Sequence, residues 1–183
     1  MNTASTPPRI LIVSGSARPG GLTRTVLKLA EALAKKKGLD AEFVCARDLR
    51  LPFFGLEEDT ASALHWRTAV QQCSGVIFGS PEYHGTFSGA FKNLIDHLDF
   101  PHIEGKPVGL IAVGGGPKSG ISTLNAMRLM FRALHAPVIV EQAAVWGGDF
   151  MPETQRPRPE LLQQMLAVVD GMSREIARCA QPV

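Results

Sequence analysis

The residues best suited to chemistry lie in a glycine-rich segment at residues 14–25, which reads SGSARPGGLTRT. Glycines allow the backbone to approach a ligand closely, and the free N–H groups at the start of a helix point toward an anion. The hydroxyls of Ser16, Thr23 and Thr25 add hydrogen-bond donors, and the guanidinium of Arg18 is a planar fork that suits a phosphate. The segment predicts a phosphate-binding loop, although a serine–glycine turn that only caps a helix explains the same residues equally well.

Two widespread phosphate-binding patterns do not match this segment. Gly15 and Gly20 have the spacing of the two glycines in a Walker A loop, but Gly21 and Leu22 replace its lysine and its serine or threonine. The G-x-G-x-x-G pattern of dinucleotide-binding folds is missing as well. The segment therefore disfavours both a P-loop nucleotide hydrolase and a dinucleotide-binding Rossmann fold.

Two further segments combine small residues with side chains that can contact a ligand. Residues 79–89 read GSPEYHGTFSG and contain the only tyrosine of the chain, Tyr83, next to His84. Residues 114–120 read GGGPKSG, and their leading glycines allow a flat or anionic group to approach the backbone. Each has a plain alternative: Tyr83 and Phe87 could pack internally, His84 could be a solvated residue, and the glycines could form a flexible turn.

Short apolar runs alternate with amphipathic stretches along the chain. Runs that are apolar at consecutive positions are typical of strands buried on both faces of a parallel sheet. We expect such strands at residues 9–14, 41–45, 75–79, 108–113 and 138–141. Apolar residues at helical spacing predict helices over residues 22–37, 61–73, 91–98, 124–134 and 161–176.

This alternation predicts an α/β fold with a parallel sheet and right-handed crossovers. The chain has 183 residues, too few for an eight-stranded barrel, which needs roughly 200–250 residues or more. We expect one doubly wound domain, residues 1–183, with residues 1–8 as a flexible N-terminus. Such sheets bind ligands at the carboxyl ends of their strands, where the strand order reverses, so the three segments should meet there.

The composition excludes several classes of protein. The formal net charge of +2, from 19 Lys and Arg against 17 Asp and Glu, gives no electrostatic basis for binding nucleic acid or an anionic membrane. The 3 cysteines are far apart in the sequence, so we expect neither a disulfide framework nor a metal site. With no visible signal sequence or membrane-spanning run, the prediction is a cytoplasmic protein with reduced thiols.

The first two segments together resemble the NAD(P)H-dependent FMN reductase family. The matching residues are Gly15-Ser16-Ala17-Arg18 and Ser80-Pro81-Glu82-Tyr83-His84-Gly85, and the second pattern continues with Gly89, Lys92, Asn93 and Asp96. The resemblance covers roughly residues 9–148. It implies a flavodoxin-like fold, a three-layer α/β sandwich with a five-stranded parallel sheet in the strand order 2-1-3-4-5.

The resemblance also implies which residues bind FMN. The phosphate would be held by Ser16, Arg18, Thr23 and the backbone N–H of Leu22. The isoalloxazine ring would be lined by Pro81, Glu82, Tyr83, His84 and Gly85, and its pyrimidine end by Gly114, Gly115 and Gly116. No side chain is expected to be catalytic, because the flavin carries the chemistry.

Two positions depart from the family pattern. His84 stands where the family usually has asparagine, which leaves the role of its side chain open. Gly21 replaces a serine that many members carry, so one hydroxyl contact to the phosphate is expected to be missing.

The resemblance implies a reductase that passes hydride from NADPH or NADH through FMN to a small electron acceptor, such as a quinone, an azo compound, a free flavin or a metal oxyanion. It does not indicate which acceptor or nicotinamide is preferred. Because there is only one domain, the donor and the acceptor are expected to use the same flavin face in turn. The expected assembly is a homodimer or homotetramer.

Two other functions stay open. The first is a flavodoxin-type electron carrier, which the near-neutral charge disfavours because such carriers are usually acidic. The second is a nucleotide-binding regulator without redox activity.

Overall fold

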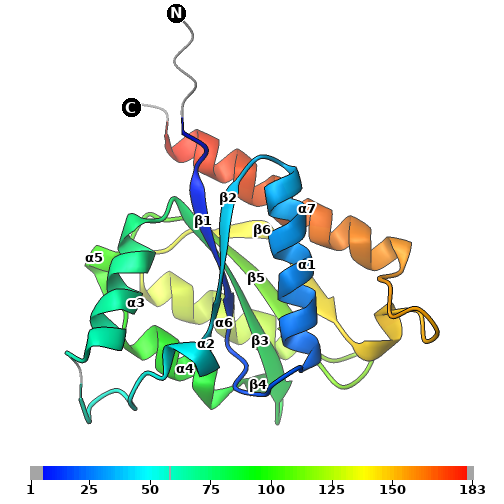
Figure 1. Ribbon diagram of the computed structural model, residues 1–183, viewed down its shortest axis with the longest axis horizontal. Helices are drawn as coiled ribbons and strands as arrows, with labels where there is room; N and C mark the ends of the chain where they lie inside the picture. Colours follow the sequence, from blue (N-terminus) through cyan, green and yellow to red (C-terminus); the bar gives the residue numbers. More distant parts are fainter. Residues whose placement is uncertain (1–5, 58, 181–183) are drawn as a thin grey trace, which may run out of the picture.

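Five parallel strands form the central sheet, in the spatial order β2-β1-β3-β5-β6 (Figure 1). They are β1 (Arg9–Ser14), β2 (Asp40–Cys45), β3 (Gly75–Tyr83), β5 (Val108–Val113) and β6 (Val138–Val145). A short strand, β4 (Thr86–Phe87), pairs antiparallel with the end of β3. The structure is a computed structural model that describes residues 6–57 and 59–180.

The sheet confirms the predicted flavodoxin-like α/β fold. The predicted order 2-1-3-4-5 corresponds to β2-β1-β3-β5-β6, because β4 intervenes in the numbering. The predicted number of strands was wrong, since the sheet has six strands when β4 is included. A strand of two residues is too short to show a period in the sequence.

Helices cover both faces of the sheet and give three layers (Figure 1). One face is covered by α1 (Leu22–Lys36) and α7 (Pro159–Cys179). The other is covered by α3 (Ala61–Gln72), α4 (Gly89–Asp96), α5 (Phe100–Ile103) and α6 (Ile121–Ala133). The sequence did not predict three short helices: α5, α2 (Ala46–Leu49), which follows β2, and the 3-10 helix η1 (Gly147–Asp149), which follows β6.

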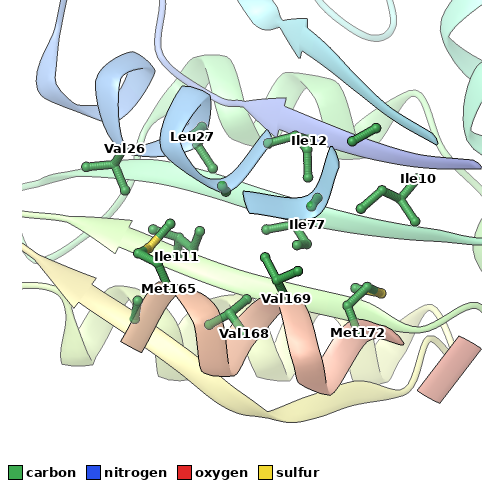
Figure 2. Packing of buried hydrophobic residues seen from close by; sticks show 14 of the residues in the cluster. Ile10, Ile12, Val26, Leu27, Ile77, Ile111, Met165, Val168, Val169 and Met172 are labelled. Carbon is green, nitrogen blue, oxygen red and sulfur yellow. The ribbon is translucent and has the colours of Figure 1, made fainter. Parts of the chain in front are cut away.

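The core is divided into two apolar layers by the sheet. Alternate residues of β1 face opposite sides: Ile10 and Ile12 pack toward α1 and α7, whereas Leu11 and Val13 pack toward α3, α4 and α6. Figure 2 shows the first layer, in which strand residues meet Leu27 of α1 and the apolar face of α7. Burial on both sides explains why β1 is a continuous apolar run in the sequence.

The ends of the described chain add two observations. The carbonyl of Pro8 accepts a hydrogen bond from the N–H of Asp40 at 3.1 Å, so the contact between β1 and β2 begins before Arg9. The first five residues of the expected flexible N-terminus lie outside the described residues. Over residues 6–57 and 59–180, no helix has the length and apolar character needed to cross a bilayer.

Glu31 provides a pH-dependent contribution to stability on α1. Its carboxylate is nearly buried and accepts hydrogen bonds from Lys28 Nζ at 2.7 Å and Lys35 Nζ at 2.8 Å. Burial raises the pKa of Glu31, but the two ammonium groups lower it, and the net pKa lies below the ordinary value of 4.5. A depressed pKa in the folded state means that the ionised carboxylate stabilises the fold above that value and that this stabilisation is lost as the pH falls.

We therefore expect Glu31→Gln to lower the free energy of unfolding at neutral pH by about 0.5–1 kcal/mol, as for two helical ion pairs. The difference from the native protein should shrink as the pH falls below the ordinary pKa of the carboxyl. Urea unfolding at neutral and acidic pH measures both effects. A difference that is the same at both pH values would contradict this account of Glu31.

Candidate functional site

The loop after β1 is held against α4 at the carboxyl edge of the sheet. The N–H of Gly15 donates to the carbonyl of Gly79 at 2.8 Å, which joins this loop to β3. A Cβ atom on Gly15 would lie 2.5 Å from Cβ of Phe91, a fully buried residue of α4. Because protein cores have no free space for such an atom, only glycine fits here, and its packing fixes where the loop begins.

Helix α1 starts at Leu22 without a side chain that caps its first N–H groups. Gly21 is the N-cap residue, and the first turn contains no acidic side chain. The N–H groups of Leu22 and Thr23 have no acceptor within the helix, as at any helix start. Ser16 Oγ lies 3.8 Å from the position that a Cβ on Gly21 would take, so a hydroxyl borders this helix end. Free N–H groups, a hydroxyl and the positive end of the helix dipole together suit a phosphate.

Arg18 lies between this helix end and the second segment. Its side chain is exposed, and its guanidinium carbon lies 5.8 Å from the centre of the Tyr83 ring. The N–H of Arg18 donates to Ser16 Oγ at 3.3 Å. Arg18 can therefore offer its charged fork to an anion that lies at the start of α1.

The second segment forms a tight β-hairpin. Strand β3 continues through Pro81, Glu82 and Tyr83, turns at His84 and Gly85, and returns as β4. Both turn residues have positive φ, 53° at His84 and 82° at Gly85, as in a two-residue type I′ turn. Asparagine and histidine adopt this left-handed conformation more readily than most residues with a side chain. Histidine in place of the family's asparagine therefore preserves the turn.

This role of His84 predicts opposite outcomes for two substitutions. His84→Asn should unfold with the same free energy as the native protein, because asparagine also tolerates positive φ. His84→Val should lower the free energy of unfolding by about 1–2 kcal/mol, because a β-branched residue is strained in this conformation. Urea unfolding of the three proteins compares them. If both variants lose the same free energy of unfolding, the imidazole itself stabilises the protein, and the conformation of the turn is not the reason for histidine at this position.

The carboxylate of Glu82 connects the hairpin to the start of α6. Its Oε2 accepts hydrogen bonds from the N–H of Gly120 at 2.8 Å and from Oγ1 of Thr123 at 2.9 Å. Gly120 is the N-cap of α6 and has no side chain to satisfy the helix end, so Glu82 caps α6 from another element. This carboxylate oxygen is therefore committed to α6.

The third segment folds on itself after β5. The N–H of Gly114 donates to the carbonyl of Val145 at 2.8 Å, and the N–H of Gly116 donates to Ser119 Oγ at 3.1 Å. A Cβ on Gly114 would overlap Cβ of Ser119, whereas a Cβ on Gly115 would meet no atom within 4 Å. Gly114 is thus required by the turn, and Gly115 borders open space.

The three segments enclose a cleft of about 210 Å³. It is lined by Ser16, Arg18, Gly21, Leu22, Thr23, Pro81, Glu82, Tyr83, Val113, Gly114 and Gly115. The structure thus brings together the predicted site residues except His84, Gly85 and Gly116. His84 and Gly85 form the hairpin turn, where His84 lines a neighbouring hollow, and the N–H of Gly116 is bonded to Ser119.

Two residues that line the cleft are not among the predicted site residues. Gly21 was noted only as a departure from the family, but as the residue before α1 it forms part of the cleft. Val113 is the last residue of β5, and its signal in the sequence was its place immediately before the glycines.

A second hollow of about 570 Å³ adjoins the cleft. Arg18 and Tyr83 border both spaces, and the second one is also lined by Ser88, Gly89 and Ala90 at the start of α4. A larger hollow of about 620 Å³ lies at the opposite edge of the sheet, beside Val138 at the start of β6. It contains none of the predicted site residues.

Comparison with known proteins agrees with this geometry. Residues 8–150 match the sequence model of the NADPH-dependent FMN reductase family. The chain belongs to this family. Membership confirms the family that the motifs predicted, an NAD(P)H-dependent reductase with FMN as its cofactor.

Two relatives are named as reductases that use a nicotinamide. The chain is 33% identical over 143 residues to NADPH azoreductase of Bacillus sp. (strain OY1-2), over 76% of this chain and 77% of that protein. It is 36% identical over 134 residues to NADH-dependent FMN reductase SfnF of Pseudomonas putida, over 70% of this chain and 72% of that protein.

Solved structures support the fold. The flavoenzyme NAD(P)H:(acceptor) oxidoreductase FerB of Paracoccus denitrificans superposes with a TM-score of 0.78 at 17% identity, over 93% of this chain and 98% of that one. A flavodoxin from the domain Archaea superposes with a TM-score of 0.65 at 13% identity, over 92% and 99% of the two chains.

The residues that line the cleft are compatible with FMN. A phosphate is complementary to the uncapped start of α1, where no carboxylate in the first turn opposes it. A flat ring is compatible with the open space beside Gly115 and with the end of β3.

Proposed function

We propose that this chain is a single-domain, cytoplasmic FMN oxidoreductase that uses NAD(P)H to reduce a small electron acceptor. The observation that carries the proposal is the uncapped start of α1, with Arg18 beside it, at the same sheet edge as the end of β3 and the glycine turn. FMN bound there supplies the chemistry of accepting a hydride and delivering electrons. The protein has to hold the ring in place and leave one of its faces accessible.

The phosphate is held by residues at the start of α1. Arg18 supplies the positive charge, Ser16 and Thr23 supply hydroxyls, and Leu22 supplies a backbone N–H. The hydroxyls of Ser16 and Thr23 and the N–H of Leu22 are held by the helix and by the packing of Gly15 on α4, so these donors are in place before the ligand arrives. They anchor the rest of the cofactor.

The ring is positioned by the hairpin and the glycine turn. Pro81, Glu82 and Tyr83 form one wall, and His84 and Gly85 maintain the turn that places this wall. At the pyrimidine end, the N–H groups of Gly114 and Gly116 already donate to Val145 and Ser119. We therefore assign the N–H that faces the pyrimidine end of the ring to Gly115. A backbone donor at this position would stabilise negative charge on the ring.

A homodimer or homotetramer is the proposed assembly. Phe53 and Leu56, in the loop before α3, are 73% and 76% exposed. Phe53 and Ala90 line a small hollow together, and Ala90 also borders the hollow beside the cleft. A second copy that covers these apolar side chains would also wall the open side of the cleft. Analytical ultracentrifugation tests this, and a monomer at micromolar concentration would contradict it.

The electron acceptor is proposed by chemical class. Because two relatives are named as azoreductases, we favour an azo compound as the acceptor. Quinones, free flavins and metal oxyanions are the other candidates, since they also need direct access to the flavin ring. The fold alone also suits a flavodoxin-type carrier. Such carriers are usually acidic and dock through that charge, whereas this chain has a net charge of +2.

Steady-state oxidation of NADPH and NADH by the FMN-loaded protein, with an azo dye or a quinone as acceptor, tests the reductase function. We expect nicotinamide oxidation that depends on both FMN and the acceptor. Tight FMN binding without any nicotinamide oxidation would favour the carrier, and no FMN binding would favour a regulator.

A further inference from the structure

Ser88 links the phosphate side of the cleft to α4. It is 3% exposed, and its Oγ donates a hydrogen bond to the carbonyl of Gly15 at 2.5 Å. The same Oγ accepts from the N–H of Phe91 at 3.0 Å and thereby caps α4. Gly15 directly precedes Ser16, so Ser88 contacts the loop that we assign to the phosphate, 73 residues away in sequence.

Ser80 continues this link toward the ring side of the cleft. It is fully buried, and its Oγ accepts a hydrogen bond from the N–H of Ser88 at 3.0 Å. It donates in turn to the carbonyl of Pro81 at 2.9 Å. Pro81 lines the cleft, so a continuous set of hydrogen bonds joins Gly15 to the hairpin. We call Ser80 and Ser88 the serine bridge.

The serine bridge spans the two parts of the cleft that hold different ends of one ligand. FMN must place its phosphate at the start of α1 and its ring at the hairpin at the same time. A ligand with two ends gains the full benefit of both contacts only if the protein holds the two sites at the right separation. We propose that Ser80 and Ser88 are positioning residues that set this separation. The inference rests on the proposed function, because it needs FMN as the ligand.

A purely structural role would leave a different pattern. If Ser88 only capped α4, its loss would lower stability and affect all ligands alike. Thr60 provides the comparison, because its Oγ1 caps α3 by accepting from the N–H of Ala63 at 3.3 Å. Thr60 does not line the cleft. Ser80 does not cap α4, so Ser80→Ala breaks the serine bridge and leaves the helix cap in place.

The experiment compares the dissociation constants of FMN and of riboflavin, which lacks the phosphate. In the native protein, the dissociation constant of riboflavin divided by that of FMN measures how much the phosphate adds to binding. We expect Ser88→Ala and Ser80→Ala to weaken FMN about tenfold, the effect of one or two hydrogen bonds, and to change riboflavin binding little. The ratio therefore falls. Ser88→Thr keeps the hydroxyl and should restore the native ratio, and Thr60→Ala should lower the melting temperature but not the ratio.

The results distinguish a failure of the positioning role of the serine bridge from a failure of the proposed function. A native ratio in both Ser80→Ala and Ser88→Ala, with lower melting temperatures only, would overturn the positioning role and leave the reductase proposal intact. A native protein that binds neither flavin would overturn the proposed function itself, and the bridge's role with it. If Ser88→Ala does not fold, Ser80→Ala decides the question.

Discussion

Replacing Arg18 by alanine raises the dissociation constant of FMN by about 10–100-fold, the usual effect of losing hydrogen bonds to a charged group. The melting temperature does not change, because the Arg18 side chain is exposed and lies over the Tyr83 ring rather than in the core. Isothermal titration with FMN measures the affinity. Riboflavin has no phosphate, so its affinity should be the same in both proteins.

Arg24→Ala is the matched control for Arg18→Ala. Arg24 is also at the start of α1, but its guanidinium pairs with Asp48 at 3.4 Å and lies over the ring of Phe43. It does not line the cleft. Its loss should leave FMN binding nearly unchanged. If the two variants lose the same FMN affinity, the effect is a general one of positive charge, and Arg18 is not part of the site.

Replacing Gly15 by alanine lowers both stability and FMN affinity. The added methyl group would lie 2.5 Å from Cβ of Phe91, a fully buried residue that cannot move away without disturbing the core. Overpacking of this kind typically costs about 1–3 kcal/mol. The strain can be relieved only by moving the phosphate loop, so FMN affinity should fall by at least about tenfold, the equivalent of one hydrogen bond.

Gly89→Ala is the comparison for this variant. A Cβ on Gly89, the first residue of α4, meets no atom within 4 Å, and its φ is not positive. The Gly89→Ala variant should be as stable as the native protein or slightly more stable. Urea unfolding and FMN titration of both variants check the two effects. A Gly15→Ala protein with native stability would show that the loop does not pack as described.

The fold could be predicted where burial leaves a regular pattern. Strands β1 and β5 have the predicted bounds because both faces are covered, so nearly every residue is apolar. Strand β3 was predicted to end at Gly79 but extends to Tyr83. Its last residues include Ser80, Pro81 and Glu82, which do not favour strands by themselves. They are extended because β5 pairs with Ser80 and Pro81, and β4 with Glu82 and Tyr83.

Most of the residues that line the cleft could be predicted from the sequence, but the hydrogen bonds between its segments could not. The glycines and Arg18 of residues 14–25 and the motif at residues 80–85 indicated two of the segments that line the cleft, although the second was expected to be a loop and not a hairpin. The bond from Glu82 to Gly120 joins residues 38 apart in sequence, and that from Ser88 to Gly15 joins residues 73 apart. Such long-range hydrogen bonds depend on the assembled fold and leave no local pattern. The sequence also showed a departure at His84, and only the positive φ explains why histidine is tolerated there.

The proposed function requires that this chain binds FMN and lets a nicotinamide reduce it. The most direct measurement is the visible absorption spectrum of the FMN-loaded protein during an anaerobic titration with NADPH. We expect the flavin band to bleach with one equivalent of NADPH per bound FMN and to return when an acceptor is added. Bound flavin that stays oxidised in excess NADPH, and in excess NADH, would contradict it.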